Sequence, residues 1–266
     1  MSRIASIFKP PIHKALITYV TVGYPSIEAT LEVVPLLARC GCDMVELGIP
    51  FSDPLADGVP IQRSSFRALQ SGVTPKICLE VARQLRRAVS IPLVFMTYYN
   101  PIFSYGLGEF CGACAKSGVD GLIIPDLPPE EGAELETISQ RHGLDLIYLL
   151  APTSSEERIR VVAERSRGFI YLVSVTGVTG TRDRLPADLE KFVGRVRQVA
   201  TQPLCVGFGI STPEQASRVA RIADGVIIGS RLIQLMEAED NFSSPVDSLI
   251  KELRSALDKP SIEKEP

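Results

Sequence analysis

The 266-residue sequence contains no tryptophan and only two histidines, His13 and His142. Both histidines lie where predicted elements begin or end, which disfavours a metal site built from histidine side chains. Of six cysteines, Cys111 and Cys114 form a CxxC, but it falls inside a helical pattern and no second CxxC follows at zinc-ribbon spacing. We therefore expect free, buried thiols and no metal in this chain.

Long apolar runs and blocks of like charge are also missing. No stretch approaches the roughly 20 apolar residues of a membrane-spanning helix. The N-terminal residues MSRIASIFKPPIHK lack the apolar core of a secretory signal. The formal net charge is only −3, which disfavours a nucleic-acid-binding surface. With 45% hydrophobic residues, the chain has ample material for a core, and we expect a cytoplasmic protein.

Segments with strand character alternate with helical patterns along the whole chain. The strands are mostly apolar and β-branched, which is typical of strands buried on both faces. They are predicted over residues 15–26, 43–50, 91–100, 121–126, 145–152, 168–174, 203–210 and 225–230. Helices are predicted over residues 3–8, 27–41, 60–71, 75–89, 105–117, 128–143, 154–166, 187–200, 212–222, 231–237 and 246–257.

This alternation favours a closed (β/α)8 barrel, the TIM-barrel fold. An open doubly wound sheet is the alternative, but it would carry a dinucleotide glycine fingerprint after the first strand, and residues 19–26 have none. We therefore predict an α/β protein with a single TIM-barrel domain over residues 1–257, a short N-terminal helix and extra helices. Residues 258–266 are predicted to be a disordered tail.

The stretch over residues 43–62, DMVELGIPFSDPLADGVPIQ, has the strongest functional pattern. Its apolar residues alternate with Glu46, Gly48 and Pro50, so Glu46 faces the other side of a strand among small residues. Asp57 follows in the exit loop. Because barrel active sites lie at the C-terminal ends of the strands, the two carboxylates are a candidate acid–base pair. A buried hydrogen-bond network and a plain Asp-Gly turn are the alternatives.

Glycine–serine turns follow the last two predicted strands, over residues 207–211 and at Gly229-Ser230. Such turns place backbone N–H groups beside helix N-termini, a geometry that binds phosphate dianions at the usual place in this fold. Tight turns without a ligand are the alternative. The predicted strand ends lack lysine, which a Schiff-base aldolase or pyridoxal-phosphate enzyme needs. The reaction type that remains is acid–base catalysis by carboxylates on a phosphorylated substrate, without a cofactor.

Six motifs, in order, resemble those of the tryptophan synthase α-subunit family: ELGIPFSDPLADGVPIQ, MTYYNP, IIPDLPPEE, YLVSVTGVTG, VGFGIS and IIGSRLI. The resemblance runs from about residue 3 to 257. It implies a lyase of L-tryptophan biosynthesis that cleaves indole-3-glycerol phosphate into indole and D-glyceraldehyde 3-phosphate by a retro-aldol reaction. It makes Glu46 the general acid and base, with a pKa raised by desolvation. Asp57, ionised, would stabilise positive charge on the indole N–H.

The resemblance also implies further site residues. An indole pocket is expected from Tyr19, Tyr98, Ile123, Tyr171 and Phe208. Family members often have phenylalanine at the position of Tyr19, so this contact departs from the family pattern. Aromatic residues here are otherwise ordinary core side chains. Phosphate is expected at Gly180, Gly209, Gly229 and Ser230, and a mobile loop is expected around Thr179.

The family resemblance implies a partner as well. This is the tryptophan synthase β subunit, in an αββα heterotetramer, and pyridoxal phosphate belongs to that subunit, not to this chain. The contact with it is expected at Pro50, Asp53 and Asp126, although Asp126 also fits the role of a helix cap.

Two rival functions remain open. The first is another phosphate-binding barrel lyase or isomerase, such as indole-3-glycerol phosphate synthase, whose catalytic lysines at strand ends this chain lacks. The second is a non-catalytic barrel that only activates a β subunit. The presence of both Glu46 and Asp57 argues for an active enzyme.

Overall fold

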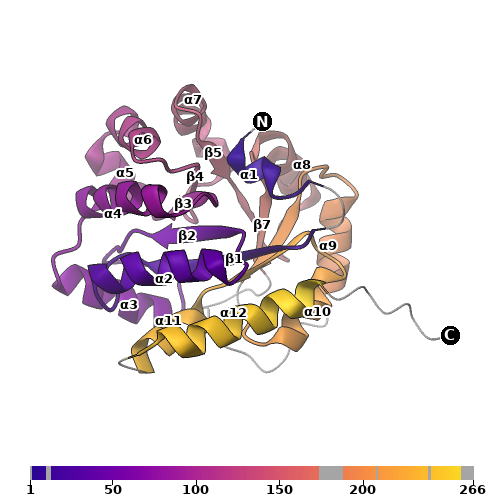
Figure 1. Cartoon of the computed structure of the whole chain (residues 1–266). Coiled ribbons are helices and arrows are strands. Elements are labelled where there is room, and N and C mark those ends of the chain that lie inside the picture. Colours follow the sequence, from indigo (N-terminus) through magenta and orange to yellow (C-terminus); the bar gives the residue numbers. More distant parts are fainter. Residues whose placement is uncertain (1, 10–12, 174–187, 208, 239–240, 259–266) are drawn as a thin grey trace.

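A computed structural model describes residues 2–9, 13–173, 188–207, 209–238 and 241–258 (Figure 1). Its strands form one nine-stranded sheet in the order β5-β4-β3-β2-β1-β9-β8-β7-β6, and all recorded pairs are parallel. The strands are β1 (Ala15–Thr21), β2 (Met44–Gly48), β3 (Leu93–Met96), β4 (Gly121–Ile123), β5 (Asp145–Ile147), β6 (Leu149–Leu150), β7 (Ile170–Val173), β8 (Leu204–Gly207) and β9 (Gly225–Ile228).

The sheet closes on itself through the chain between β5 and β6. These two strands lie at opposite ends of the strand order, yet only Tyr148 separates them in sequence. β5 pairs with β4, and β6 pairs with β7. The predicted fifth strand is therefore interrupted once, at Tyr148, and its two parts complete the barrel. The predicted eightfold TIM barrel is confirmed.

Helices surround the sheet (Figure 1). They are α1 (Arg3–Ser6), α2 (Ile27–Arg39), α3 (Val59–Gln70), α4 (Pro75–Ala88), α5 (Tyr99–Tyr105), α6 (Leu107–Lys116), the 3-10 turn η1 (Pro129–Glu131), α7 (Ala133–Arg141), α8 (Glu156–Arg165), α9 (Leu189–Arg197), α10 (Pro213–Ala220), α11 (Ser230–Ala238) and α12 (Ser243–Asp258). Among the described residues, none of these helices is both long and apolar enough to cross a membrane.

Local sequence explains where several helices begin and end. The side chain of Ser26 accepts the Ala29 N–H at 3.1 Å and so is the N-cap of α2, and this helix continues through Pro35. The predicted helix over 105–117 corresponds to α6, and α5 precedes it as a helix that was not predicted. Gly106 separates α5 from α6 with φ +95°, a conformation that suits glycine. The third strand ends earlier than predicted, because α5 already starts at Tyr99.

Aspartates tie the strands together at the N-terminal end of the barrel. Asp43 Oδ2 accepts the Leu16 N–H at 2.8 Å, and two other aspartates accept strand N–H groups in the same way: Asp120 from Leu93 at 2.9 Å and Asp224 from Leu204 at 2.8 Å. Each carboxylate also forms an ion pair with an arginine, namely Arg254, Arg86 and Arg197 respectively. These carboxylates stabilise the barrel and are already engaged at the end opposite the expected active site.

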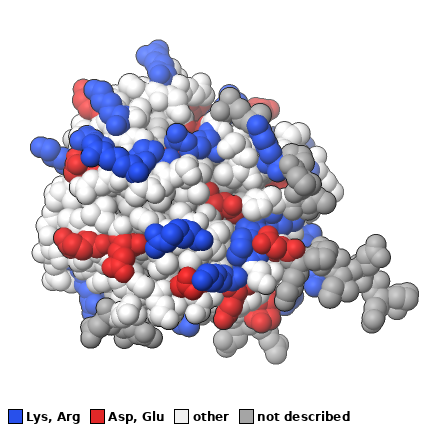
Figure 2. All heavy atoms as spheres, in the orientation of Figure 1, with Lys and Arg blue, Asp and Glu red and all other residues white. Residues whose placement is uncertain are grey.

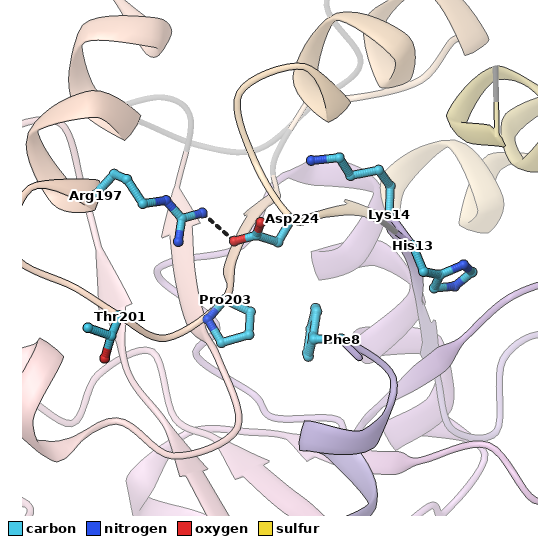
Figure 3. A pocket seen from close by; sticks show the side chains of 7 residues that line it. All are labelled: Phe8, His13, Lys14, Arg197, Thr201, Pro203 and Asp224. Atoms are coloured by element: carbon cyan, nitrogen blue, oxygen red, sulfur yellow. Dashed lines mark hydrogen bonds and ion pairs between the residues drawn. The ribbon is translucent and has the colours of Figure 1, made fainter. Parts of the chain in front are cut away.

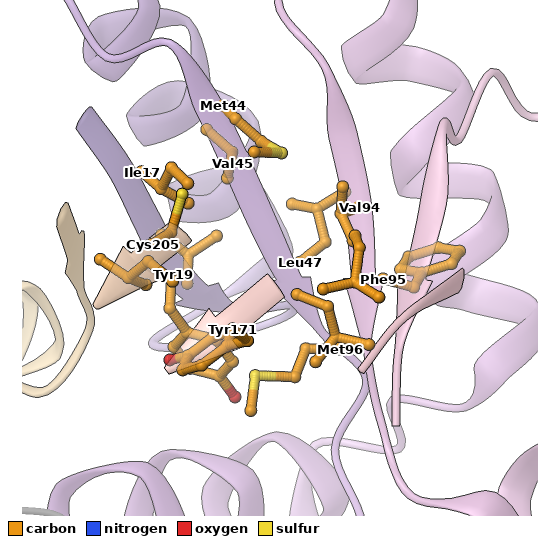
Figure 4. Close-up of a cluster of buried hydrophobic side chains, with 14 of the residues drawn as sticks. Ile17, Tyr19, Met44, Val45, Leu47, Val94, Phe95, Met96, Tyr171 and Cys205 are labelled. Carbon is orange, nitrogen blue, oxygen red and sulfur yellow. The ribbon is translucent and has the colours of Figure 1, made fainter. Parts of the chain in front are cut away.

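Buried side chains fill the barrel and the layer beneath its helices (Figure 4). All six cysteines are free and buried, as predicted. On the face drawn in Figure 2, positive and negative side chains lie side by side over α2 and α12. Lys251 and Asp247 of α12, for example, form an ion pair of 2.9 Å. The charged surface of this face is therefore mixed in sign.

Candidate active site

Glu46 lies in the middle of β2 and is completely buried. It pairs in register with Tyr19 of β1 and Val94 of β3, so its side chain lies between two neighbouring strands of the barrel. Neither carboxylate oxygen has a hydrogen-bond partner. Burial raises the pKa of Glu46 to about 8, which confirms the expected direction. At neutral pH this side chain is therefore mainly a protonated acid, able to donate and then to recover a proton.

Asp57 lies in the loop that connects β2 to α3 and is only 5% exposed. Tyr98 Oη donates a hydrogen bond of 3.1 Å to its Oδ2, while Oδ1 has no partner. Burial raises the pKa of Asp57 to about 6, and the Tyr98 hydrogen bond opposes that rise. Asp57 is thus mainly ionised at neutral pH, when Glu46 is mainly protonated. Two carboxyl groups whose pKa values differ in this way are a candidate acid–base pair.

The loop that carries Asp57 is held by two further contacts. Tyr98 Oη accepts the Ala56 N–H at 2.9 Å, and the Gln62 side chain donates to the Asp57 carbonyl at 2.8 Å. The ring of Tyr98 stacks on Phe51, with ring centroids 5.2 Å apart. These contacts place Asp57 at the C-terminal side of the barrel.

Tyr19 of β1 and Tyr171 of β7 are buried in the barrel, and each packs its phenol group against a glycine of the neighbouring strand. A Cβ atom on Gly48 would lie 2.1 Å from Tyr19 Oη, and one on Gly207 would lie 2.3 Å from Tyr171 Oη. The absence of these Cβ atoms makes room for the phenol groups. Figure 4 shows both tyrosines at the same end of the labelled cluster.

The Glu46 and Asp57 carboxyl groups both act electrostatically on Tyr19 and Tyr171. Burial raises the pKa of Tyr171, and Glu46 and then Asp57 raise it further. Burial also raises the pKa of Tyr19, to which Asp57 and Glu46 contribute. The structure therefore brings together Glu46, Asp57 and three of the predicted pocket residues, counting Tyr98. Ile123, at the end of β4, is also buried.

The structure describes three of the four residues predicted to bind phosphate: Gly209, Gly229 and Ser230. Gly229 and Ser230 lie where β9 gives way to α11, and Ser230 is the first residue of that helix. Gly209 has φ +83°. Helix N-termini favour phosphate because their first N–H groups lack partners within the helix. Phe208, Gly180 and Thr179 lie outside the described residues.

Gln215 changes the expected use of the other glycine–serine turn. Its side-chain oxygen accepts the Ser211 N–H at 2.8 Å and the Thr212 N–H at 3.3 Å. It also forms a capping box with Thr212 at the start of α10. These two N–H groups are thus already satisfied within the protein.

The residues expected at a partner interface differ in exposure. Pro50 is buried, whereas Asp53 and Asp126 are exposed. Asp126 Oδ1 accepts the Tyr99 N–H at 2.9 Å, so it caps α5, which starts after the preceding strand, and not the helix that follows Asp126. Sequence reasoning missed large exposed apolar side chains near these residues: Leu55, 87% exposed, follows Asp53 in the same loop, and Phe103, 64% exposed, lies on α5, the helix that Asp126 caps.

A hollow of about 380 Å³ lies at the opposite end of the barrel (Figure 3). Lys14 and Asp224, which precede β1 and β9, contribute to its wall. Their polar groups are engaged, because Lys14 Nζ donates to the Ala223 carbonyl at 2.8 Å and Arg197 pairs with Asp224. The remaining lining residues are Phe8, His13, Thr201 and Pro203. This hollow lies at the N-terminal end of the barrel strands, which serves stability in this fold, and not at the C-terminal end, where the loop with Asp57 lies.

A closed parallel barrel with two buried carboxyl groups, one on β2 and one in the loop after it, fits the barrels of the lyase and isomerase class. Within the described residues, no cluster of three or more histidine, cysteine or acidic side chains could hold a metal ion. The family model described as tryptophan synthase alpha chain matches residues 8–259. The chain belongs to the tryptophan synthase alpha chain family.

Individual relatives agree with this family. The tryptophan synthase alpha chain of Dehalococcoides mccartyi is 58% identical over 97% of this chain and 100% of its own length. The tryptophan synthase alpha chain of Geobacter sulfurreducens is 50% identical over 97% of this chain and 99% of its own length. The solved structure of Mycobacterium tuberculosis tryptophan synthase matches with a TM-score of 0.90 and 37% identity, covering 96% of this chain and 98% of that one. The structure of tryptophan synthase subunit alpha from Legionella pneumophila matches with a TM-score of 0.88 and 37% identity, covering 97% of this chain and 99% of that one.

Sequence reasoning missed several residues around the site. Ser64 and Gln62 of α3 both hydrogen-bond to groups near the carboxylate pair, yet each reads as an ordinary polar residue of a helix. Gln215 is the exception, since a Thr-Pro-x-Gln stretch is a recognisable capping box. That pattern could have shown that the α10 N-terminus is already occupied.

Proposed function

We propose that this chain cleaves indole-3-glycerol phosphate into indole and D-glyceraldehyde 3-phosphate. The observation that supports this most strongly is Glu46, a buried and unpartnered acid with a pKa of about 8, which acts on the same two tyrosines, Tyr19 and Tyr171, as Asp57, whose pKa is about 6. A retro-aldol cleavage without a cofactor needs one group that donates a proton and takes one up, and a second that stabilises the charge formed between these steps.

The protonated Glu46 transfers its proton to C3 of the indole ring, which leaves positive charge on the ring nitrogen. Asp57, ionised and hydrogen-bonded to the ring N–H, stabilises that charge. The Glu46 carboxylate then removes the proton of the side-chain hydroxyl as the carbon–carbon bond breaks. The bonding electrons return to the ring, and indole and the aldehyde are released. Glu46 ends the cycle protonated, as it began.

The rest of the site binds the two ends of the substrate. Tyr19, Tyr98, Ile123, Tyr171 and Phe208 surround the indole ring. The phosphate contacts backbone and hydroxyl groups of Gly180, Gly209, Gly229 and Ser230. The loop around Thr179 closes over the bound substrate and excludes water.

The chain acts with a tryptophan synthase β subunit, in an αββα heterotetramer in the cytoplasm. Pyridoxal phosphate belongs to the β subunit, and this chain uses no cofactor. Asp53 and Asp126, with Pro50 beneath the surface, belong to the contact. The exposed Leu55 and Phe103 extend it with apolar side chains, which favour burial at a protein interface. One barrel domain over residues 1–257 performs these roles. Asp258, predicted to begin a tail, is instead the last residue of α12, and residues 259–266 lie outside the described residues.

The test supplies indole-3-glycerol phosphate to the purified chain, alone and with a β subunit, and measures indole. We expect indole in both cases, and Glu46→Gln to reduce its formation by about 100-fold or more. Glu80→Gln, an exposed change on α4, is the matched control and keeps activity. A chain that stimulates a β subunit but never forms indole would instead be the non-catalytic activator.

A further inference from the structure

Three buried hydroxyl groups form a chain that starts at Tyr19, the register partner of Glu46. Tyr19 Oη and Thr21 Oγ1, both on β1, are 3.3 Å apart. Thr21 Oγ1 and Ser64 Oγ of α3 are 2.6 Å apart, and Ser64 Oγ donates to the Ile61 carbonyl at 2.9 Å. This relay joins the strand beside Glu46 to the helix that follows the Asp57 loop.

The carbonyl at its far end sets the direction of the relay. A carbonyl oxygen can only accept a hydrogen bond, so the Ser64 hydroxyl donates its single proton to the hydrogen bond with the Ile61 carbonyl. Ser64 must then accept the proton of Thr21, and Thr21 in turn must accept the proton of Tyr19. Each hydroxyl has only one proton to give, so Tyr19 has none left for another partner. What remains on Tyr19 Oη are its unused lone pairs.

The Tyr19 oxygen lies close to the acid–base pair. It occupies the space of a Cβ on Gly48, which is two residues beyond Glu46 and therefore on the same face of β2. Tyr19 is also the register partner of Glu46. Both oxygens of Glu46, and Oδ1 of Asp57, lack partners in the described structure.

We propose that Thr21 and Ser64 are positioning residues for the acid–base reaction: they take up the Tyr19 hydroxyl proton, so that the Tyr19 oxygen faces the cavity only as a hydrogen-bond acceptor. Tyr19 and Glu46 share no hydrogen bond, so the effect acts through space: the oxygen end of the hydroxyl dipole disfavours negative charge on Glu46, whereas a hydroxyl proton pointing into the barrel interior would favour it. The relay thus favours the protonated Glu46 with which the cycle begins. Other titratable groups facing this cavity are Asp57, Tyr98, Tyr171 and Cys205, and none of them belongs to the relay.

Ser64→Ala tests the direction of the relay without touching the cavity itself. Without its acceptor, Thr21 donates to Tyr19, and the Tyr19 proton becomes free to point into the barrel interior, where it favours ionised Glu46. We expect the titration midpoint of Glu46 to fall by about one pH unit. Tyr19→Phe removes the acceptor without adding a donor, so it should lower the midpoint by less. Ser65→Ala is the control, because it removes the same atom from the next buried residue of α3, outside the relay.

The measurement is an infrared titration of the protonated carboxyl band of Glu46, assigned by its loss in Glu46→Gln. It needs no turnover, whereas the role in the reaction rests on the proposed function and is read from the pH dependence of kcat. Midpoints in the order wild type and Ser65→Ala, then Tyr19→Phe, then Ser64→Ala support the relay. Any other order, including equal midpoints for Ser64→Ala and Ser65→Ala, overturns it. The same order in a chain that forms no indole would overturn only the proposed function.

Discussion

The phenol of Tyr98 donates a hydrogen bond of 3.1 Å to the Asp57 carboxylate and accepts one of 2.9 Å from the N–H of the preceding residue, Ala56. One hydroxyl from the β3 side of the barrel thereby orients both the backbone and the side chain of the loop after β2. The orientation of the Asp57 carboxylate depends on this contact across 41 residues of sequence.

Tyr98→Phe removes both hydrogen bonds and keeps the ring. Burial already raises the pKa of Asp57 to about 6, and the Tyr98 bond opposes that rise, so its loss raises the pKa further. We expect the acid side of the pH profile of kcat to move up by about one pH unit. Tyr105→Phe, on the partly exposed end of α5, is the control and leaves the profile in place. An unchanged acid side in Tyr98→Phe would contradict this role.

Glu46 makes stability depend on pH. Its pKa of about 8 in the folded protein exceeds the ordinary value of 4.5, so between these values the folded chain binds more protons than the unfolded chain. The free energy of unfolding therefore decreases as pH rises through this window. Glu46→Gln removes the effect and should be more stable than wild type near pH 8, by about 2–4 kcal/mol.

Urea denaturation at about pH 5 and about pH 8 measures this difference. The exposed Glu80→Gln provides the comparison, since Glu80 lies in a surface ion pair with Arg83. Wild type and Glu46→Gln with parallel pH dependence would show that Glu46 is already ionised in the folded state.

Gly48 is required by the position of Tyr19. A Cβ at Gly48 would lie 2.1 Å from the Tyr19 oxygen, so Gly48→Ala overpacks the barrel and should cost about 1–3 kcal/mol, with loss of activity. Tyr19→Leu in the same chain should recover part of that stability. At Gly108 of α6 nothing lies within 4 Å of the added atom, and Gly108→Ala should stabilise by about 0.5–1 kcal/mol. Thermal denaturation compares the four proteins, and equal effects at the two glycines would refute the steric argument.

Phe103 tests the proposed partner surface. It is 64% exposed on α5, the helix capped by Asp126. Phe103→Ala should weaken binding of a β subunit by about 10-fold or more, because large aromatic side chains contribute strongly to interfaces. Indole formation by the chain alone should not change. Val199→Ala, at an exposed position beyond α9, is the control, and isothermal titration measures both affinities. If Phe103→Ala and Val199→Ala bind the β subunit with equal affinity, Phe103 of α5 does not belong to the interface.

Much of the barrel was predictable because its elements are encoded locally. Alternation and β-branched residues mark the strands, while Ser26 and the Thr212–Gln215 box mark helix starts. Boundaries were less predictable where a strand end and a helix start overlap, as at Tyr99, or where one residue interrupts a strand, as at Tyr148. Hydrogen bonding with the neighbouring strands decides those positions, and a local pattern does not contain it.

The residues proposed to carry the chemistry follow from the sequence. Glu46 stands within a strand pattern and Asp57 in the loop beyond it, since side-chain alternation is a local property. The protonation state of these groups follows from the tertiary structure. Burial from all sides raises the pKa of Glu46, and contacts across 41 and 43 residues place Tyr98 on Asp57 and Thr21 on Ser64. Closure of the barrel creates these proximities, because it brings strands that are distant in sequence around one interior.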